Sequence, residues 1–231
     1  MKFGYVALLG ALLVSSAQAQ EAKFGTFSGA VALTSDYVFR GFSQSDEHPA
    51  FQPALNWDSG AGFHANLWAS NVDFNDGGEG DIEVDVTLGY AGTVDKLSYD
   101  IGAIYYAYPG ARNALNYNYW EGFTTLGYDT GTVKLNGSVF YSPDFFGGLK
   151  DAWAVQGGFS VPVAESLSFD AQVGRQLLKA SRGGADYTYW NAGLTYSFPL
   201  ADVGIRYHDT NVSVCGGQCG ARAVLTISKS F

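Results

Sequence analysis

Acidic side chains recur at every second position around residue 83, and this spacing is the first feature of the sequence that could do chemistry. Asp81, Glu83 and Asp85 alternate with Ile82 and Val84. In a β-strand, side chains two positions apart point the same way, so the carboxylates share one face and the apolar side chains the other. A face of carboxylates attracts cations and repels anions. This face could therefore bind or conduct cations.

The segment that leads into this strand is also acidic. Residues 71–81 read N-V-D-F-N-D-G-G-E-G-D. Several carboxylates in one loop suggest Ca²⁺, which takes about six to eight oxygen ligands. The spacing fits neither the EF-hand pattern nor the glycine-rich calcium repeat, which it misses by one residue. We predict no metal site and interpret the segment as a solvated acidic loop, with calcium binding left open.

Cys215 and Cys219 are the two cysteines of the chain, in the segment C-G-G-Q-C. A metal site would need further ligands, and His208 alone does not supply them. In an exported protein the pair is expected to be oxidised, so we predict a disulfide that pins a loop.

An enzyme would need a nucleophile or base with its partners. No G-x-S-x-G segment is present. His208 and Asp209 are adjacent, and adjacent residues of a strand point to opposite faces, so they form a catalytic pair poorly. We predict that the protein is not an enzyme and takes no cofactor.

The elements that carry these residues are predicted to be β-strands. Twelve segments show the required alternation, and most of them are about as long as a tilted strand needs to be to cross a bilayer. An even number of strands is typical of bacterial outer-membrane barrels. The predicted strands are 26–42, 50–57, 62–70, 81–91, 97–108, 117–128, 131–141, 152–161, 166–176, 187–198, 201–210 and 222–231.

The connections between these segments alternate between tight turns and longer polar loops. Residues 58–61 and 129–131 are examples of the turns, and residues 43–49 and 177–186 are examples of the loops. Short turns at one end and long loops at the other are typical of outer-membrane barrels, whereas a soluble sandwich has no reason to alternate in this way. We predict an all-β fold, a transmembrane antiparallel up-and-down β-barrel of about twelve strands.

The ends and the composition of the chain fit export to a membrane. Residues 1–19 combine Lys2, an apolar stretch and the small-x-small site Ala17-Gln18-Ala19, which predicts a signal peptide followed by a barrel domain at 20–231. No later run of apolar residues is long enough for a transmembrane helix. The formal net charge of −9 argues against nucleic acid as a partner.

Charged side chains on the inward faces are predicted to line the lumen. A barrel of twelve strands lies between those filled by side chains and those with wide channels, which indicates a narrow pore. Because no loop looks long enough to fold into the lumen, we expect wall side chains to set the pore size. The predicted pore-lining residues are Asp36, Arg40, Glu83, Asp85, Asp100, Glu121, Lys134, Asp170, Arg206 and Arg222.

One string in the first segment has a family resemblance. Residues 33–44 read L-T-S-D-Y-V-F-R-G-F-S-Q, followed by Pro49, Phe51, Gln52 and Pro53. This string resembles the opening signature of the TorF family of proteobacterial outer-membrane porins. The resemblance implies a barrel that passes small solutes, and it brings no catalytic residues.

Within the string, alternation predicts the direction of each side chain. Tyr37 and Phe39 are expected to face lipid, Asp36 and Arg40 to face the lumen, and Gly41 to allow a bend into the first loop.

Two functions are consistent with these features. We expect a porin in the outer membrane of a Gram-negative bacterium, which passes small solutes or ions with a weak preference for cations. The alternative is a structural or adhesive barrel with a plugged lumen that acts through its outer loops. The expected partners are the lipid bilayer, lipopolysaccharide and, through the terminal Phe231, the barrel assembly machinery. The transported solute and the oligomeric state stay open.

Overall fold

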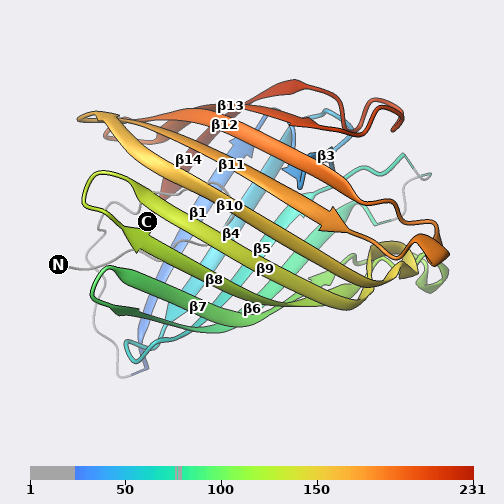
Figure 1. Ribbon diagram of the computed structural model, residues 1–231, viewed down its shortest axis with the longest axis horizontal. Helices are drawn as coiled ribbons and strands as arrows, with labels where there is room; N and C mark the ends of the chain where they lie inside the picture. The colour runs from blue at the N-terminus through green and yellow to red at the C-terminus, as the bar shows by residue number, and fades with distance from the viewer. Residues whose placement is uncertain (1–23, 76, 78–79) are drawn as a thin grey trace.

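Twelve β-strands close into a single barrel in the computed structural model, which describes residues 24–75, 77 and 80–231 (Figure 1). The predicted signal peptide, residues 1–19, lies outside the described residues. In chain order the barrel strands are β1 (Thr26–Thr34), β4 (Ala50–Asp58), β5 (Phe63–Asn71), β6 (Ile82–Val94), β7 (Leu97–Ala107), β8 (Tyr119–Asp129), β9 (Lys134–Phe145), β10 (Lys150–Ala164), β11 (Leu167–Leu177), β12 (Tyr187–Ser197), β13 (Asp202–Thr210) and β14 (Arg222–Ser230).

Every neighbouring pair of barrel strands is antiparallel, and β1 pairs with both β4 and β14, which closes the barrel. The predicted up-and-down barrel is therefore confirmed. In the residues that the structure describes, three short 3₁₀ helices lie in connections: η1 (Asn113–Leu115), η2 (Phe146–Gly148) and η3 (Ala180–Arg182). None of the helices in the described part of the chain is long and apolar enough to cross a membrane.

The strands form because their apolar and polar residues alternate. In β12, Trp190 and Leu194 are 36% and 41% exposed on the outer surface, whereas Asn191 between them contacts polar side chains of the interior. In β6 the difference in exposure between the two faces is larger, since Leu88 is 61% exposed and Glu83 only 2%. The outside of the barrel is therefore apolar and the inside polar, which is the reverse of a soluble β-sandwich.

The two ends of the barrel differ. At one end, the turn end, connections are as short as the two residues Asp95 and Lys96 between β6 and β7. At the other, the loop end, they include residues 35–49, 72–81, 108–118 and 211–221. β9 and β10 extend further than predicted, so most of the expected loop at 142–151 is strand.

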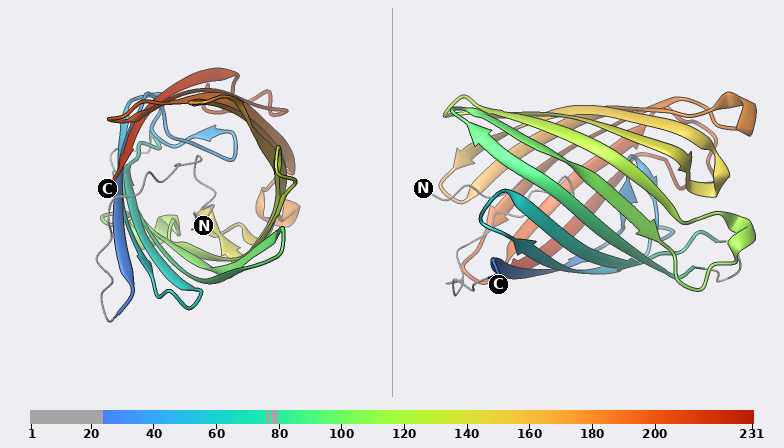
Figure 2. Two further views of the ribbon diagram at one scale, coloured as in Figure 1. Left: turned by 90° about the vertical axis from the view of Figure 1, so that its left-hand side faces the viewer. Right: turned by 90° about the horizontal axis from the view of Figure 1, so that it is seen from below.

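The first predicted strand is wrong beyond Thr34. β1 ends there, and residues 35–49 fold back into the barrel; we call this segment the inward loop. It contains the hairpin of β2 (Val38–Phe39) and β3 (Phe42–Ser43), which lies inside the ring of strands in Figure 2. Arg40 (φ 45°) and Gly41 (φ 87°) form its two-residue turn, and positive φ at both positions matches the type I′ geometry of tight hairpins.

The side chains of the inward loop are also placed differently from the prediction. Tyr37 does not face lipid: it is 4% exposed, and its ring meets that of Trp68 edge-on at 5.2 Å. Phe39 packs edge-on against Tyr106 at 6.0 Å. Burying a large apolar side chain contributes about 1.5–3 kcal/mol, which favours the fold-back over a straight strand. The prediction that no loop enters the lumen is therefore wrong.

Candidate functional site in the barrel interior

A buried ion pair fixes the tip of the inward loop to the barrel wall. The Arg40 guanidinium donates to both carboxylate oxygens of Glu121 on β8, at 2.8 and 2.7 Å, and to Gln176 Oε1 on β11 at 3.0 Å. The guanidinium also lies 4.7 Å from the ring centre of Phe140 on β9. Tyr106 donates to Glu121 Oε2 at 3.0 Å. The inward loop leaves the wall between the neighbouring strands β1 and β4, and β8 to β11 lie opposite these strands in the ring, so the loop crosses the lumen to reach Glu121 and Gln176.

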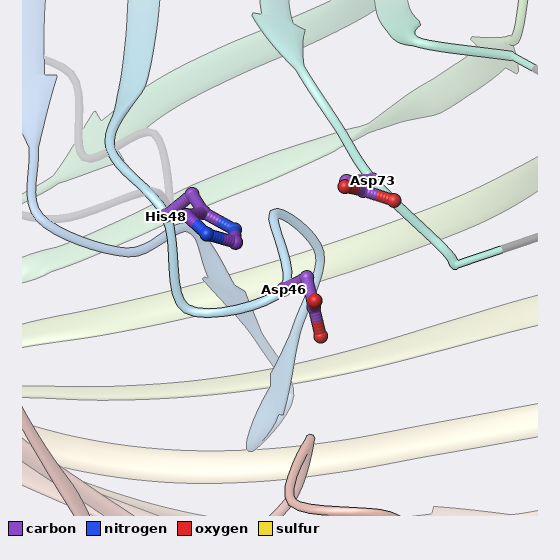
Figure 3. Close-up of side chains that lie close together, drawn as sticks. All are labelled: Asp46, His48 and Asp73. Atoms are coloured by element: carbon purple, nitrogen blue, oxygen red, sulfur yellow. The ribbon is translucent and has the colours of Figure 1, made fainter. Parts of the chain in front are cut away.

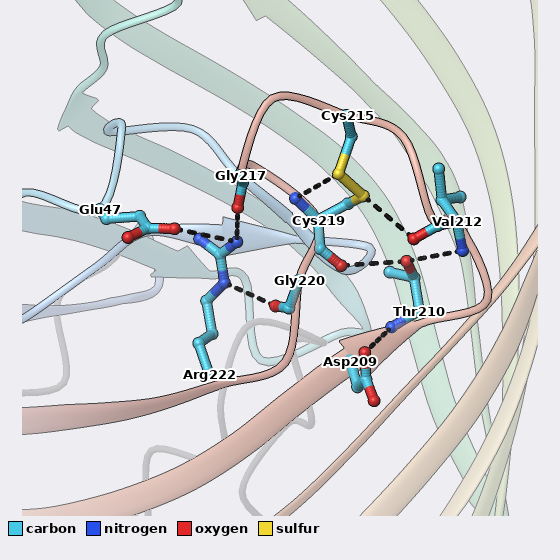
Figure 4. The surroundings of a disulfide bond; sticks show 9 residues. All are labelled: Glu47, Asp209, Thr210, Val212, Cys215, Gly217, Cys219, Gly220 and Arg222. Atoms are coloured by element: carbon cyan, nitrogen blue, oxygen red, sulfur yellow. Dashed lines mark hydrogen bonds and ion pairs between the residues drawn. A yellow bond between two sulfur atoms is a disulfide. The ribbon is translucent and has the colours of Figure 1, made fainter.

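A second ion pair holds the base of the inward loop. The Asp36 carboxylate accepts hydrogen bonds from Ser43 Oγ at 2.6 Å, from Ser45 Oγ at 3.1 Å and from Arg222 Nη1 at 2.8 Å. Arg222 also lies 3.4 Å from Glu47 (Figure 4). The first residue of β14 is therefore anchored to both ends of the hairpin.

The connection between β13 and β14, residues 211–221, also contacts Arg222 and the inward loop. Cys215 and Cys219 are joined by a disulfide, with their Cα atoms 5.9 Å apart. Gly217, between them, accepts a hydrogen bond from Arg222 Nη2 at 2.6 Å (Figure 4). The Gln218 carbonyl accepts one from the backbone amide of Ser43 at 2.7 Å. The disulfide thus restrains a loop that packs directly on the inward loop.

Two further carboxylates lie beside the hairpin. Glu83 and Asp85 are 2% and 4% exposed, and Tyr37 donates to Glu83 Oε1 at 3.2 Å. Burial, together with these two carboxylates, raises the pKa of the Tyr37 hydroxyl well above its usual value, so Tyr37 stays a neutral donor. In the described part of the chain, Glu83 Oε2 and Asp85 Oδ1 are buried without a hydrogen-bond partner. This pair places two buried carboxyl groups side by side in the interior.

Aromatic side chains close the loop end around these charges. Tyr37, Trp68, Val72, Tyr106, Tyr108 and Tyr119 belong to one buried cluster. Phe74 and Phe146, from two different connections, pack against it with their ring centres 5.2 Å apart. The interior at the loop end is therefore filled by side chains of the wall, the inward loop and its neighbours.

The interior at the turn end is polar and open to water. His64 and Asp100 are paired at 2.9 Å with side chains 16% and 20% exposed, and Arg206 and Asp170 are paired at 2.7 Å with 21% and 18%. The first pair spans β6 at Gly89, where an added Cβ would lie 2.5 Å from His64 Nε2. Lys134 lies at the start of β9 and is exposed.

Of the ten predicted pore-lining residues, eight lie next to another member of the set, and two do not. The structure brings together Arg40 with Glu121, Asp36 with Arg222, Asp170 with Arg206, and Glu83 with Asp85. Asp100 pairs instead with His64, and Lys134 stands apart from these groups at the turn end. Asp36 and Arg40 reach the lumen from the inward loop and not from the wall.

Sequence reasoning missed Tyr37, Gln176 and His64 as parts of this interior. The length of the predicted strand 26–42 could have revealed the position of Tyr37, because a spanning strand needs only roughly nine to eleven residues. The Arg40-Gly41 pair between short aromatic stretches is also a hairpin signal. For Gln176 and His64 the sequence offers no signal, because their partners lie on distant strands.

Solved structures share this fold. The KdgM porin has a TM-score of 0.60 with this chain at 9% sequence identity, and the match covers 88% of this chain and 99% of that one. LpxR from Salmonella typhimurium has a TM-score of 0.51 at 9% identity, with coverage of 88% and 99%. At such low identity these likenesses show the fold alone.

Sequence comparison identifies the family. None of the curated proteins matches the chain. The TorF resemblance is not tested by these comparisons and stays a prediction. The model of the family Gcw_chp, described as a bacterial protein of unknown function, matches residues 18–231, and the chain therefore belongs to the Gcw_chp family.

Proposed function

We propose that this protein is a narrow channel of the porin type in the outer membrane of a Gram-negative bacterium, with the inward loop as its constriction. The observation that carries the proposal is the closed barrel with an apolar exterior and a polar interior. Exposed apolar residues occur on strands all around it, among them Leu33, Leu67, Ile101, Val155 and Ile205. Such a surface suits lipid, and closure leaves no unpaired strand edge in the bilayer.

The polar interior at the turn end supports passage of water and small solutes. Charged and amide side chains there are part-exposed, and a wet lumen is usual where a barrel interior is polar. The likeness to the KdgM porin and the TorF resemblance of residues 33–44 point the same way. The predicted signal peptide fits export, and Phe231, exposed beside β1 at the turn end, is available to the assembly machinery.

A second candidate function is a structural or adhesive barrel with a permanently plugged lumen. The observation that favours it is the dense filling at the loop end, where Gln176 is fully buried and Glu121 is 1% exposed.

A measurement of conductance distinguishes the channel from the plugged barrel. In planar bilayers we expect the purified protein to give small current steps, and a variant with residues 36–48 replaced by a short Gly-Ser linker to give much larger ones. Silence of the unmodified protein, with or without current through the variant, would favour the plugged barrel.

Cation preference is expected to depend on Glu83 and Asp85. The buried carboxylates Glu121 and Asp36 are paired with Arg40 and Arg222, so Glu83 and Asp85 are the buried interior acids that these two arginines leave over. Under a salt gradient we expect the reversal potential to show a modest cation preference. The double substitution Glu83→Gln plus Asp85→Asn should lower it.

Salt should weaken this preference too, because charges are screened over about 8 Å at physiological ionic strength. Asp144→Asn, on an exposed side chain at the loop end, serves as the control and should leave selectivity unchanged. Anion preference in the unmodified protein, or an unchanged reversal potential in the double variant, would contradict the assignment.

The orientation of the barrel predicts which connections face the cell exterior. Short turns face the periplasm in bacterial barrels and long loops face outward. A peptide tag inserted after Gly183, in a long loop, should bind antibody on intact cells, whereas one inserted after Gly131, in a tight turn, should not. Both glycines have open space around them, so either insertion is sterically tolerable. Labelling of the Gly131 tag alone would reverse the orientation.

A further inference from the structure

Three metal-ligating side chains meet at the loop end, outside the interior site. A carboxylate oxygen of Asp46, a ring nitrogen of His48 and a carboxylate oxygen of Asp73 all lie within 4.8 Å of one another (Figure 3). Asp46 and His48 belong to the inward loop, and Asp73 belongs to the connection between β5 and β6. The group is accessible to solvent. The acidic segment 71–81 did not by itself indicate this site, because Asp46 and His48 come from a different connection.

The backbone holds the two segments in this arrangement. Ser45 and Asp73 form a parallel β-bridge, and the Asp73 amide donates to the Gln44 carbonyl at 2.7 Å. Within the inward loop, the His48 amide donates to the Ser45 carbonyl at 2.9 Å, and Ser45 Oγ donates to the His48 carbonyl at 2.7 Å. Hydrogen bonds to main-chain atoms therefore hold together the two segments that carry the three side chains.

The donor set indicates the class of metal. Ca²⁺ and Mg²⁺ take oxygen ligands almost exclusively, whereas an imidazole nitrogen suits Zn²⁺ and its transition-metal neighbours. Two ligands of a tetrahedral zinc ion stand about 3.4 Å apart, given metal–ligand distances of about 2.1 Å. The three ligand atoms, within 4.8 Å of one another, are already near that spacing. Two carboxylates also balance the charge of a divalent ion.

We propose that Asp46, His48 and Asp73 bind one divalent transition-metal ion such as Zn²⁺, with water completing the coordination. Ser45, Asn71 and Asp81 line the hollow that His48 and Asp73 also line, and they supply polar surroundings. Since two of the ligands belong to the inward loop and the third to its neighbour, the bound ion ties these segments together. On the proposed channel function, this ion holds the constriction in place: zinc at 100 times its Kd disfavours loop release about a hundredfold.

The first experiment measures binding without reference to conduction. The full-length mature protein, free of any polyhistidine tag and refolded in detergent, is titrated with ZnCl₂ by calorimetry. We expect one zinc ion per chain, and at least about tenfold weaker binding in His48→Gln and in Asp73→Asn. Asp144→Asn, an exposed acid elsewhere at the loop end, is the matched control and should bind zinc as the unmodified protein does. The circular dichroism spectrum checks that each variant folds.

Two outcomes would overturn the site: zinc affinity unchanged in both His48→Gln and Asp73→Asn, or CaCl₂ binding as tightly as ZnCl₂, which would mean that the histidine does not contribute. A second experiment adds zinc to the protein in a planar bilayer, where conductance should fall for the unmodified chain and not for His48→Gln. A protein that never conducts would refute the channel and leave the calorimetric result standing, so the two proposals fail separately.

Discussion

Replacing Arg40 with alanine is expected to increase the single-channel conductance of this barrel severalfold. The guanidinium bridges β8 and β11 and is only 5% exposed, and its partner Glu121 is 1% exposed. Removing one member of a buried ion pair leaves the other charge uncompensated, at a cost of about 3–5 kcal/mol. The chain can avoid this cost if the inward loop swings out and water reaches Glu121.

The size of the effect follows from that energy. Since about 1.36 kcal/mol corresponds to a tenfold change in an equilibrium constant, release of the loop should become more favourable by a factor of about a hundred to several thousand. Local opening of this kind leaves the strand pairing of the barrel intact. The measurement is current through the purified variant in a planar bilayer, compared with the unmodified protein at the same salt concentration.

Three further variants sharpen this test. Glu121→Gln leaves Arg40 without its counter-charge and should act in the same direction. Arg40→Lys keeps the charge but loses the bidentate hydrogen bonding to Glu121, so its conductance should lie between those of Arg40→Ala and the unmodified protein. Lys150→Ala breaks an exposed ion pair with Asp144 outside the interior and should change nothing. Equal conductance in Arg40→Ala and the unmodified protein would show that the inward loop is not the constriction.

Replacing Leu194 with arginine should impair folding into lipid far more than the same change at Thr195. Leu194 lies near the middle of β12, 41% exposed on the outer surface, beside Phe169 and Ile205. On the proposed membrane placement the new charge enters the hydrocarbon, at a cost of about 2–4 kcal/mol near the midplane. Thr195 points inward beside Gly204, so an arginine there can reach the water of the lumen.

Urea titrations of both variants in lipid vesicles measure this difference, with the unmodified protein as the reference. We expect the free energy of unfolding to fall by about 2–4 kcal/mol in Leu194→Arg and to stay nearly unchanged in Thr195→Arg. Equal loss in both variants would mean that the outer surface does not face lipid.

The sequence by itself determined the barrel. Alternation in segments such as 81–91 and 187–198 sets which side chains point outward, because neighbouring residues of a strand point to opposite faces whatever the rest of the chain does. Turn and loop lengths then set the up-and-down order, since a connection of a few residues can only join adjacent antiparallel strands. Glu83, Asp85 and Glu121 were placed on the inner face by this local rule alone.

Only the tertiary structure decided what happens inside the barrel. The string that begins at Asp36 alternates like a strand, yet it turns inward because its partners are Glu121, Gln176 and Arg222, which lie far away in the sequence. The same holds for the approach of His48 to Asp73. Local alternation carries no information about contacts between distant segments. Burial of aromatic rings and pairing of charges become available only after the barrel has closed around them.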